Sequence, residues 1–374
     1  MLASLLSIVK GSAQTTDSSK QTNWVSRTYQ KIMKDTLPPE RARFLVYPTL
    51  AYSPETSLEI GFAAVRLFYV NQDIVNNRLS EIYAFAFGTL RRQYGMEFEH
   101  SIYGDHDSWF FLGRGKFQRF PLLYYGIGPE TVGDHPFLID GTYVQLRERV
   151  LRKIVPNLFI GPEIDLQLLH NPRFEPDLSP LPLGGEGSRT FGLGVGLVYD
   201  NRHNVMNVRK GLFGELAVLD YRPAWGSDWK FSSLNLDVRY FVPLKADKSQ
   251  VLGFQGFGKF VSGEVPFNQL ALMGGPFLMR GYYLGRFRDR NYLAVQAEYR
   301  MLPFPFSKRI GATVFASGGM VGPTVGELRI SQLKPAAGVG FRYLIFPKKD
   351  IFVRFDFAFT QEGPGFYIYT GEAF

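Results

Sequence analysis

Histidine supplies much of the acid–base and metal-binding chemistry available near neutral pH, and the sequence contains five: His100, His106, His135, His170 and His203. None stands in a nucleophile motif. His106 lies between Asp105 and Asp107, and this trio offers metal-binding atoms. The same residue types are common in turns, where their side chains bond to nearby backbone. We therefore interpret the trio as a turn, and we expect no metal site.

The sequence supports neither dinucleotide binding nor a membrane lipase. Gly192, Gly194 and Gly196 resemble the spacing of a dinucleotide-binding loop, but they occupy alternate positions of a predicted strand and no helix follows to bind phosphate. A lipase acting in a membrane would need a serine and a histidine on adjacent strands facing lipid, and we place no such pair. The absence of cysteine excludes disulfides, thiol catalysis, zinc fingers and a lipoprotein anchor. The sequence predicts neither an enzyme nor a cofactor.

The net charge is +8, from 42 Lys and Arg against 34 Asp and Glu, which suits either nucleic acid or an anionic membrane surface. The basic residues are scattered through predicted strands and form no recognisable nucleic-acid motif. We therefore favour a membrane and expect no nucleic-acid partner.

Composition decides how the chain would cross that membrane. The longest apolar runs, residues 2–9 and 191–199, are about half of the roughly 18 residues that a transmembrane helix needs. Aromatic residues nevertheless make up 16% of the chain, while the mean hydropathy is close to zero. A transmembrane β-barrel has this composition, because every second residue of each strand points into a polar lumen.

From residue 44 onward the sequence alternates between apolar and polar residues. In residues 109–118, Trp109, Phe111 and Phe117 alternate with Arg114 and Lys116, and residues 158–169, 234–241 and 351–360 divide in the same way. About 16 such strands are predicted, starting near Phe44, Leu58, Ser80, Tyr94, Trp109, Gly141, Leu158, Thr190, Leu212, Trp229, Val251, Asn291, Ile310, Pro335, Ile351 and Gly365. The predicted fold is all-β: a 16-stranded antiparallel transmembrane β-barrel over residues 44–374.

Turn lengths orient this barrel. With both termini on the periplasmic side, the short turns 153–157 and 347–350 fall inside, while the long loops 119–138, 171–189 and 264–290 fall outside, as in bacterial outer-membrane barrels. Residues 1–14 are interpreted as a possible signal peptide, the alternative being a retained amphipathic terminus. Residues 15–43 are interpreted as a polar spacer followed by a short N-terminal amphipathic helix, which either packs on the barrel or anchors at the interface.

The most specific motif is the loop sequence GGPFLMRGY, residues 274–282, which contains Met279, Arg280, Gly281 and Tyr282 and precedes a strand with AEYR, residues 297–300. Together with GLGVGLVYD (192–200), AGVGFRY (337–343) and a terminal GEAF with Gly371 and Phe374, it resembles the Omp85 superfamily of bacterial surface-antigen barrels, to which BamA belongs. The order and spacing match over about residues 44–374. The resemblance identifies Gly371 and Phe374 as a C-terminal strand signal.

The resemblance implies that the arginine loop folds back into the lumen and packs on strands near the carboxy terminus. It also implies that the first and last strands pair weakly and form a lateral seam. Assembly and secretion members of the family carry POTRA domains before the barrel, and 43 residues are too few for one. The chain therefore resembles the branch that lacks POTRA domains.

Inside a barrel, Arg280 needs carboxylates or carbonyls, because it cannot be neutralised by deprotonation. Alternation places Glu298 and Asp356 on lumen faces, and both are candidate partners. The family usually has an aspartate where this chain has Ser317, which accepts a hydrogen bond but carries no charge. Either the loop is held less tightly here or Asp356 substitutes.

Three functions remain open. The first is destabilisation of the bilayer at the seam, which would help a client protein or lipid enter or cross the outer membrane of a Gram-negative bacterium. The second is a gated pore, closed by the Arg280 loop and by the aromatic loop 120–137. The third is a structural barrel that binds partner proteins or outer-membrane lipids, lipopolysaccharide included, with a homo-oligomer or a partner barrel as further possibilities.

Overall fold

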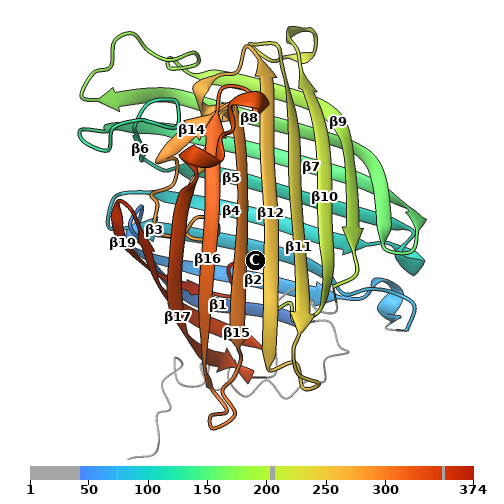
Figure 1. Cartoon of the computed structure of the whole chain (residues 1–374). Coiled ribbons are helices and arrows are strands. Elements are labelled where there is room, and N and C mark those ends of the chain that lie inside the picture. Colours follow the sequence, from blue (N-terminus) through green and yellow to red (C-terminus); the bar gives the residue numbers. More distant parts are fainter. Residues whose placement is uncertain (1–42, 74, 203–206, 348–349) are drawn as a thin grey trace, which may run out of the picture. The chain divides into compact units, whose positions relative to one another are not determined.

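The computed structural model describes residues 43–374 except residues 74, 203–206 and 348–349, and these residues belong to one compact unit. Their strands wrap into a closed barrel (Figure 1). The predicted signal peptide and amphipathic helix lie outside the described residues. Within the described part, no helix is long and apolar enough to cross a membrane.

The barrel has 16 strand positions, and each strand runs antiparallel to its neighbours in chain order. β5 and β6 share one position, because they pair with successive parts of β7. The strands are β1 (Arg43–Ser53), β2 (Ser57–Phe68), β3 (Ser80–Thr89), β4 (Tyr94–Tyr103), β5 (Trp109–Arg119), β6 (Leu122–Tyr124), β7 (Phe137–Val155), β8 (Leu158–Glu175), β9 (Ser188–Asp200), β10 (Gly211–Tyr221), β11 (Phe231–Pro243), β12 (Gln250–Gly263), β15 (Asn291–Met301), β16 (Ile310–Gly322), β17 (Lys334–Phe346), β18 (Ile351–Thr360) and β19 (Gly363–Thr370).

Short elements lie in the connections. The long loop between β12 and β15 contains a small hairpin of β13 (Ala271–Met273) and β14 (Phe287–Asp289). Single 3-10 turns are η1 (Val70–Gln72), η2 (Asp105–Asp107), η3 (Pro223–Trp225), η4 (Phe267–Gln269), η5 (Val325–Glu327) and η6 (Ile330–Gln332). The Asp105–His106–Asp107 trio is thus a turn, in which Asn77 and Arg78 bond to the two aspartates.

The predicted 16-stranded antiparallel barrel is confirmed. The start at Gly141 was wrong by four residues, because β7 begins at Phe137 and pairs there with β6. β8 likewise continues to Glu175. The loops predicted over residues 119–138 and 171–189 therefore include the beginning of β7 and the end of β8. Tyr124, Phe174 and Phe267 are buried together at this end of the barrel, and their contacts stabilise the extension.

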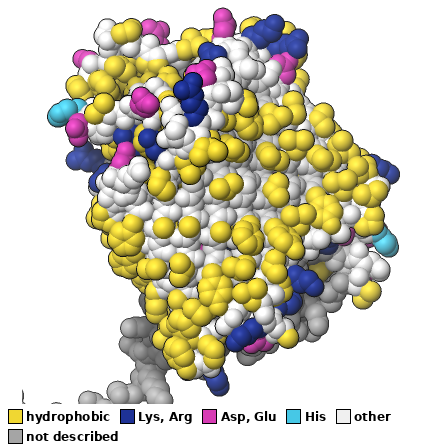
Figure 2. Space-filling view, in the orientation of Figure 1, with side chains coloured by type: hydrophobic (Ala, Val, Ile, Leu, Met, Phe, Trp, Pro, Cys, Tyr) yellow, Lys and Arg dark blue, Asp and Glu magenta, His cyan; other side chains and the backbone are white. Residues whose placement is uncertain are grey.

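Alternate residues face lipid and lumen. On β15, Leu293 and Val295 are exposed, whereas Gln296, Glu298 and Arg300 are buried in the barrel interior. On the face shown in Figure 2, apolar side chains cover a wide middle zone, and charged side chains gather mainly toward its ends. This distribution is that of a protein surrounded by hydrocarbon between two polar interfaces.

The contact that closes the barrel is short. β1 pairs with β2 from end to end, whereas its register with β19 in the described chain consists of Tyr52↔Ile368 alone. β19 ends at Thr370, and Gly371 adopts a positive φ of 90°, a conformation that glycine tolerates without strain. The final residues then turn inward, where Phe374 is buried. Within the described residues, most of this edge of β1 therefore lacks a strand partner.

Candidate functional site

The loop between β12 and β15, residues 264–290, folds into the barrel. Its buried side chains Met273, Met279, Tyr282 and Phe287 form one apolar cluster with residues on the inner faces of β15 and β16. These contacts remove the loop from the external surface and hold its tip against the wall. Arg280 is thereby placed inside the lumen, with only 1% of its surface exposed.

Arg280 binds two carboxylates at once. Its Nη1 donates to Oδ2 of Asp356 at 2.7 Å, and its Nη2 donates to Oε2 of Glu298 at 2.5 Å. The guanidinium carbon lies 3.5 Å from the centre of the Phe315 ring, close enough for a cation–π interaction. The planar guanidinium can reach both carboxylates because its donors point in fixed, divergent directions. Both candidate partners identified by alternation therefore contact Arg280.

Three further arginines complete a buried ion cluster, which we call the arginine cluster. Arg300 donates to Glu298, while Arg342 and Arg354 both donate to Asp356. Glu372 accepts a hydrogen bond from Nε of Arg342 at 2.9 Å. The cluster thus contains four arginines and three carboxylates: Arg280, Arg300, Arg342, Arg354, Glu298, Asp356 and Glu372. Its members come mainly from β15, β17 and β18, whose alternate residues face inward.

Ser317 takes no part in this cluster. Its backbone lies opposite Gln296 in the β15–β16 register, and no hydrogen bond joins it to Arg280 in the described structure. The residue beside the guanidinium is Phe315, two positions away on the same face of β16. Arg280 thus contacts the Phe315 ring and the Asp356 carboxylate, while Ser317 makes no hydrogen bond to it in the described structure.

The neighbours of Arg280 in the motif each make a separate contact. The backbone N–H of Gly281 donates to the Tyr367 hydroxyl at 2.9 Å, and the Tyr282 hydroxyl donates to the carbonyl of Pro335 at 3.1 Å. Gly281 has a φ of +106°, and a Cβ there would lie 2.5 Å from Cγ2 of Thr360. Only glycine fits this position without displacing its neighbours. The motif thus connects the loop to β17, β18 and β19.

The loop also contacts the first hairpin of the barrel. The backbone N–H of Leu284 donates to Oε1 of Glu55 at 2.8 Å, and Glu55 lies in the turn between β1 and β2. Burial raises the pKa of the Glu55 carboxyl above its usual range. Its second oxygen, Oε2, is buried without a hydrogen-bond partner. One loop therefore touches strands on both sides of the β1–β19 contact.

Gly371 and Phe374 lie beyond the end of β19, so neither belongs to a strand here. The Phe374 ring lies 5.7 Å from the Phe241 ring and 4.9 Å from the guanidinium of Arg300, measured between centres. Arg300 Nη2 also donates to the Phe374 carbonyl at 2.9 Å. The end of the chain thus contacts the arginine cluster from the side of the barrel where β11 ends and β12 begins.

Sequence reasoning missed two members of the arginine cluster and two contacts of the loop. Arg342 could have been predicted, because it stands between the apolar residues Phe341 and Tyr343 of β17. Alternation therefore places it on the lumen face. Glu55, Glu372 and Tyr367 gave no such signal. The first two lie outside the strands, where the two-residue period does not apply, and the Tyr367 contact depends on how the loop folds.

The outer face carries one polar pair that the sequence did not predict. Nε2 of His100 lies 2.9 Å from Oε2 of Glu148, two strands away, across the bare backbone of Gly113. A Cβ at Gly113 would come within 2.4 Å of both side chains. The histidine thus pairs with a carboxylate and not with a serine. The described residues contain no group of three potential ligands that could hold a metal ion.

The sequence matches the Omp85 superfamily domain over residues 163–374. BamA from Haemophilus ducreyi lacking POTRA domains 1-3 is 14% identical, with a TM-score of 0.57 over 88% of this chain and 70% of that chain. CdiB from Acinetobacter baumannii is 11% identical, with a TM-score of 0.54 over 88% and 65% of the two chains.

CdiB from Escherichia coli is 8% identical, with a TM-score of 0.57 over 93% of this chain and 70% of that chain. At these identities the structural likeness shows the fold alone. No curated protein matches the sequence. The family match covers more than half of the chain, and the barrel, its inward-folded arginine loop and its apolar belt agree with it. The chain therefore belongs to the Omp85 superfamily and is a bacterial outer-membrane β-barrel.

Proposed function

We propose that this barrel assists the insertion or passage of a polypeptide or lipid at the seam between β1 and β19. The observation that carries the proposal is the register of that contact, which in the described chain is Tyr52↔Ile368 alone. Every other neighbouring pair of full-length strands is joined by eight or more register positions. The seam is the part of the wall that can separate with the fewest broken hydrogen bonds.

The free edge of β1 is chemically suited to accept a strand. Each backbone N–H or C=O left unpaired in hydrocarbon costs several kcal/mol, so such an edge strongly favours a new partner. An extended client segment that adds to β1 would satisfy these groups through main-chain hydrogen bonds. Recognition of this kind depends little on the client's side chains. A lipid could also pass at this edge, because the unpaired backbone of β1 perturbs the bilayer beside it.

The inward-folded loop is positioned to restrain the seam. On the β19 side it is held by Arg280 through Asp356 and by Gly281 through Tyr367. On the β1 side it is held through the Leu284–Glu55 hydrogen bond. The restraint on the β1 side is a single hydrogen bond to a turn, whereas the other side is a buried ion cluster. We infer that β1 and β2 move and that β15–β19 stay with the loop.

A reversible crosslink across the seam tests the proposal. The chain has no cysteine, so Tyr52→Cys with Ile368→Cys introduces one disulfide between directly paired residues. The matched control is Phe62→Cys with Ala86→Cys, a directly paired couple between β2 and β3. The assay is the rate at which a urea-unfolded eight-stranded outer-membrane barrel inserts into liposomes that contain each variant.

We expect the oxidised seam variant to lose the acceleration that the wild type gives over protein-free liposomes, and a reductant to restore it. The oxidised control should act as the wild type does. Equal acceleration by the oxidised seam variant and the control would contradict the proposal.

A gated pore is the second candidate, and the lumen volume favours it. The inward-folded loop leaves two recesses of about 590 and 630 Å³ beside it. The loop therefore divides the lumen without filling it, and its removal would join these spaces into a wider path.

A further inference from the structure

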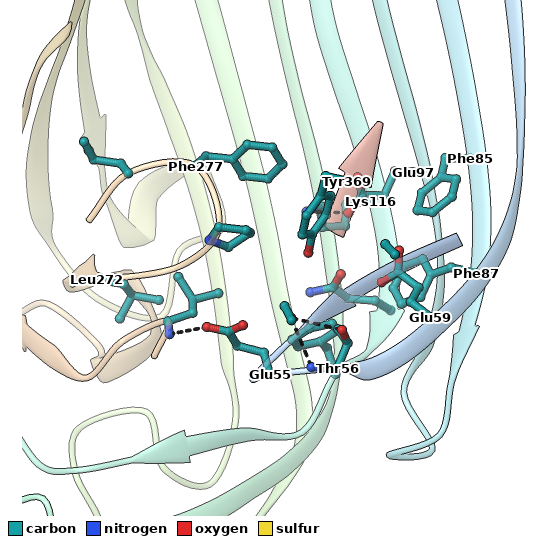
Figure 3. Close-up of a pocket in the computed structure, with 18 of the residues that line it drawn as sticks. Glu55, Thr56, Glu59, Phe85, Phe87, Glu97, Lys116, Leu272, Phe277 and Tyr369 are labelled. Carbon is teal, nitrogen blue, oxygen red and sulfur yellow. Dashed lines mark hydrogen bonds and ion pairs between the residues drawn. The ribbon is translucent and has the colours of Figure 1, made fainter. Parts of the chain in front are cut away.

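One recess in the lumen has a composition that the proposed function does not use. It lies between the inner faces of β1–β4 and the inward-folded loop, and its volume is about 590 Å³ (Figure 3). We call it the aromatic chamber and define it by six of its lining residues: Glu55, Glu59, Tyr83, Phe85, Phe87 and Phe277. This volume falls within the range of ordinary small-molecule sites.

Aromatic rings line two sides of the aromatic chamber. Tyr83, Phe85 and Phe87 follow one another on the inner face of β3, with ring centroids 6.3 and 5.5 Å apart. On the loop side the Phe277 ring lies 5.4 Å from that of Tyr369. Lumen faces of outer-membrane barrels are usually polar. On the loop side the guanidinium of Arg354 already lies 5.3 Å from the Phe277 ring and 5.0 Å from the Tyr369 ring. Among the described residues, no cation lies over the three rings of β3, and packing does not close the space beside them.

Two carboxylates of the aromatic chamber, those of Glu55 and Glu59, have no ion pair in the described structure. Glu59 is only 7% exposed, and in the described structure it has neither a hydrogen bond nor an ion pair. Glu55 uses Oε1 for the loop, while its Oε2 is buried and unpartnered. A buried carboxylate without a counterion is costly, so natural proteins rarely leave one unused.

The two cations that line the aromatic chamber, Lys116 and Arg239, are already paired, and Arg239 lies 2.5 Å from Asp237. Glu59, Glu81, Glu97 and Glu99 all project from β2–β4 toward the lumen recesses, and no lysine or arginine side chain described on these strands does so. The nearby ammonium of Lys116, on β5, is already 2.6 Å from Glu97. A lumen wall with charges of one sign concentrates mobile ions of the opposite sign. The part of the wall formed by β2–β4 therefore favours entry of a cation from outside the chain.

The lining also specifies what kind of cation would fit. Calcium and magnesium require several converging oxygen ligands, and the described residues contain no such group. Aromatic faces instead attract ammonium groups through their quadrupoles, and they bury attached carbon at the same time. We propose that the aromatic chamber binds a small organic cation, an ammonium group carried on an apolar chain or ring, with Glu59 as its counterion.

The probe for this proposal is 2-phenylethylammonium, and its neutral counterpart is 2-phenylethanol. Binding to the full chain in detergent micelles is measured by isothermal titration calorimetry. We expect saturable binding of the ammonium and at least tenfold weaker binding of the alcohol. Glu59→Gln should weaken binding of the ammonium by about tenfold or more, which corresponds to roughly 1.4 kcal/mol.

The matched control is Glu99→Gln, which removes the same charge from the lumen but does not line the aromatic chamber. It should bind the ammonium as the wild type does. Phe85→Leu provides a second variant with no change in charge, and loss of one cation–π contact should weaken binding about threefold or more. If Glu59→Gln does not fold, as judged by its heat-modifiable gel migration, the affinity of Phe85→Leu for the ammonium decides the test.

Equal binding of alcohol and ammonium would overturn the proposal. So would unchanged binding by both chamber variants, or an equal loss in Glu99→Gln, which would indicate general attraction by the lumen charge. The crosslinking assay of the seam is unaffected by any of these outcomes, because it uses neither the probe nor these residues.

Discussion

Replacing Arg280 by alanine is the most direct perturbation of the arginine cluster. The variant loses two hydrogen bonds to charged groups, each of which contributes roughly 1.5–3 kcal/mol. No carboxylate loses its last cation, however, because Glu298 keeps Arg300 and Asp356 keeps two other arginines. Repulsion among the arginines also falls. We therefore expect the free energy of unfolding to drop by about 3 kcal/mol, the lower end of the summed range.

Asp356→Asn should be more damaging than Arg280→Ala. Asp356 accepts hydrogen bonds from Arg280, Arg342 and Arg354, so its neutralisation leaves all three with less compensating charge. Removing one partner of a buried ion pair typically costs about 3–5 kcal/mol, and here three pairs share the partner. We expect a loss of about 5 kcal/mol. The expected order of the two losses in unfolding free energy follows from counting charges. It does not depend on the absolute size of either loss.

The assay is urea unfolding in detergent, followed by the fraction of protein that keeps its folded gel migration without boiling. Arg189→Ala is the control, because its ion pair with Asp228 is exposed and is worth roughly 0–1 kcal/mol. A double variant, Arg280→Ala with Asp356→Asn, should lose less than the sum of the single losses. The reasoning is refuted if Arg280→Ala is the more damaging change, or if it loses no more than Arg189→Ala.

Three further predictions follow from the loop and its contacts. Gly281→Ala should destabilise the barrel by about 1–3 kcal/mol in the same unfolding assay. Gly363→Ala should lose less stability, because Gly363 also has a positive φ but faces open space. Equal losses in the two variants would assign the effect to the backbone alone. Because burial raises the pKa of Glu55, the folded state binds its proton more readily than the unfolded state, so wild-type stability should rise as the pH falls through that raised pKa. Glu55→Gln should lack this gain, and parallel pH profiles of the two proteins would contradict the assignment. Deletion of residues 276–288 should raise single-channel conductance in planar bilayers, since the loop divides the lumen; a folded deletion variant with unchanged conductance would show that the loop is not a plug.

Strand positions could be predicted because lipid and lumen impose opposite polarity on successive residues. This period located all 16 barrel positions, and it also put Glu298 and Asp356 on inner faces. The rule fails where strands leave the bilayer. β7 begins at Phe137 because aromatic packing, and not alternation, extends it beyond the barrel wall.

Contacts made by turns and loops could not be predicted in the same way. Glu55 lies in a three-residue turn, and only the path of a loop more than 200 residues later in the chain brings Leu284 to it. The pairing of His100 with Glu148 likewise depends on register across two strand pairs and on the missing side chain of Gly113. A period of two residues excludes a register shift of one residue but does not distinguish shifts of two residues.

Site-specific photo-crosslinking to an inserting substrate tests the account most directly. A photoreactive phenylalanine derivative replaces Val46, which faces outward on the free edge of β1, or Val238, which faces outward on β11 away from the seam. During insertion of the urea-unfolded eight-stranded barrel, we expect crosslinks to the substrate from position 46 and not from position 238. Crosslinks of equal yield at both positions, or from position 238 alone, would contradict the claim that β1 and β19 form the working seam.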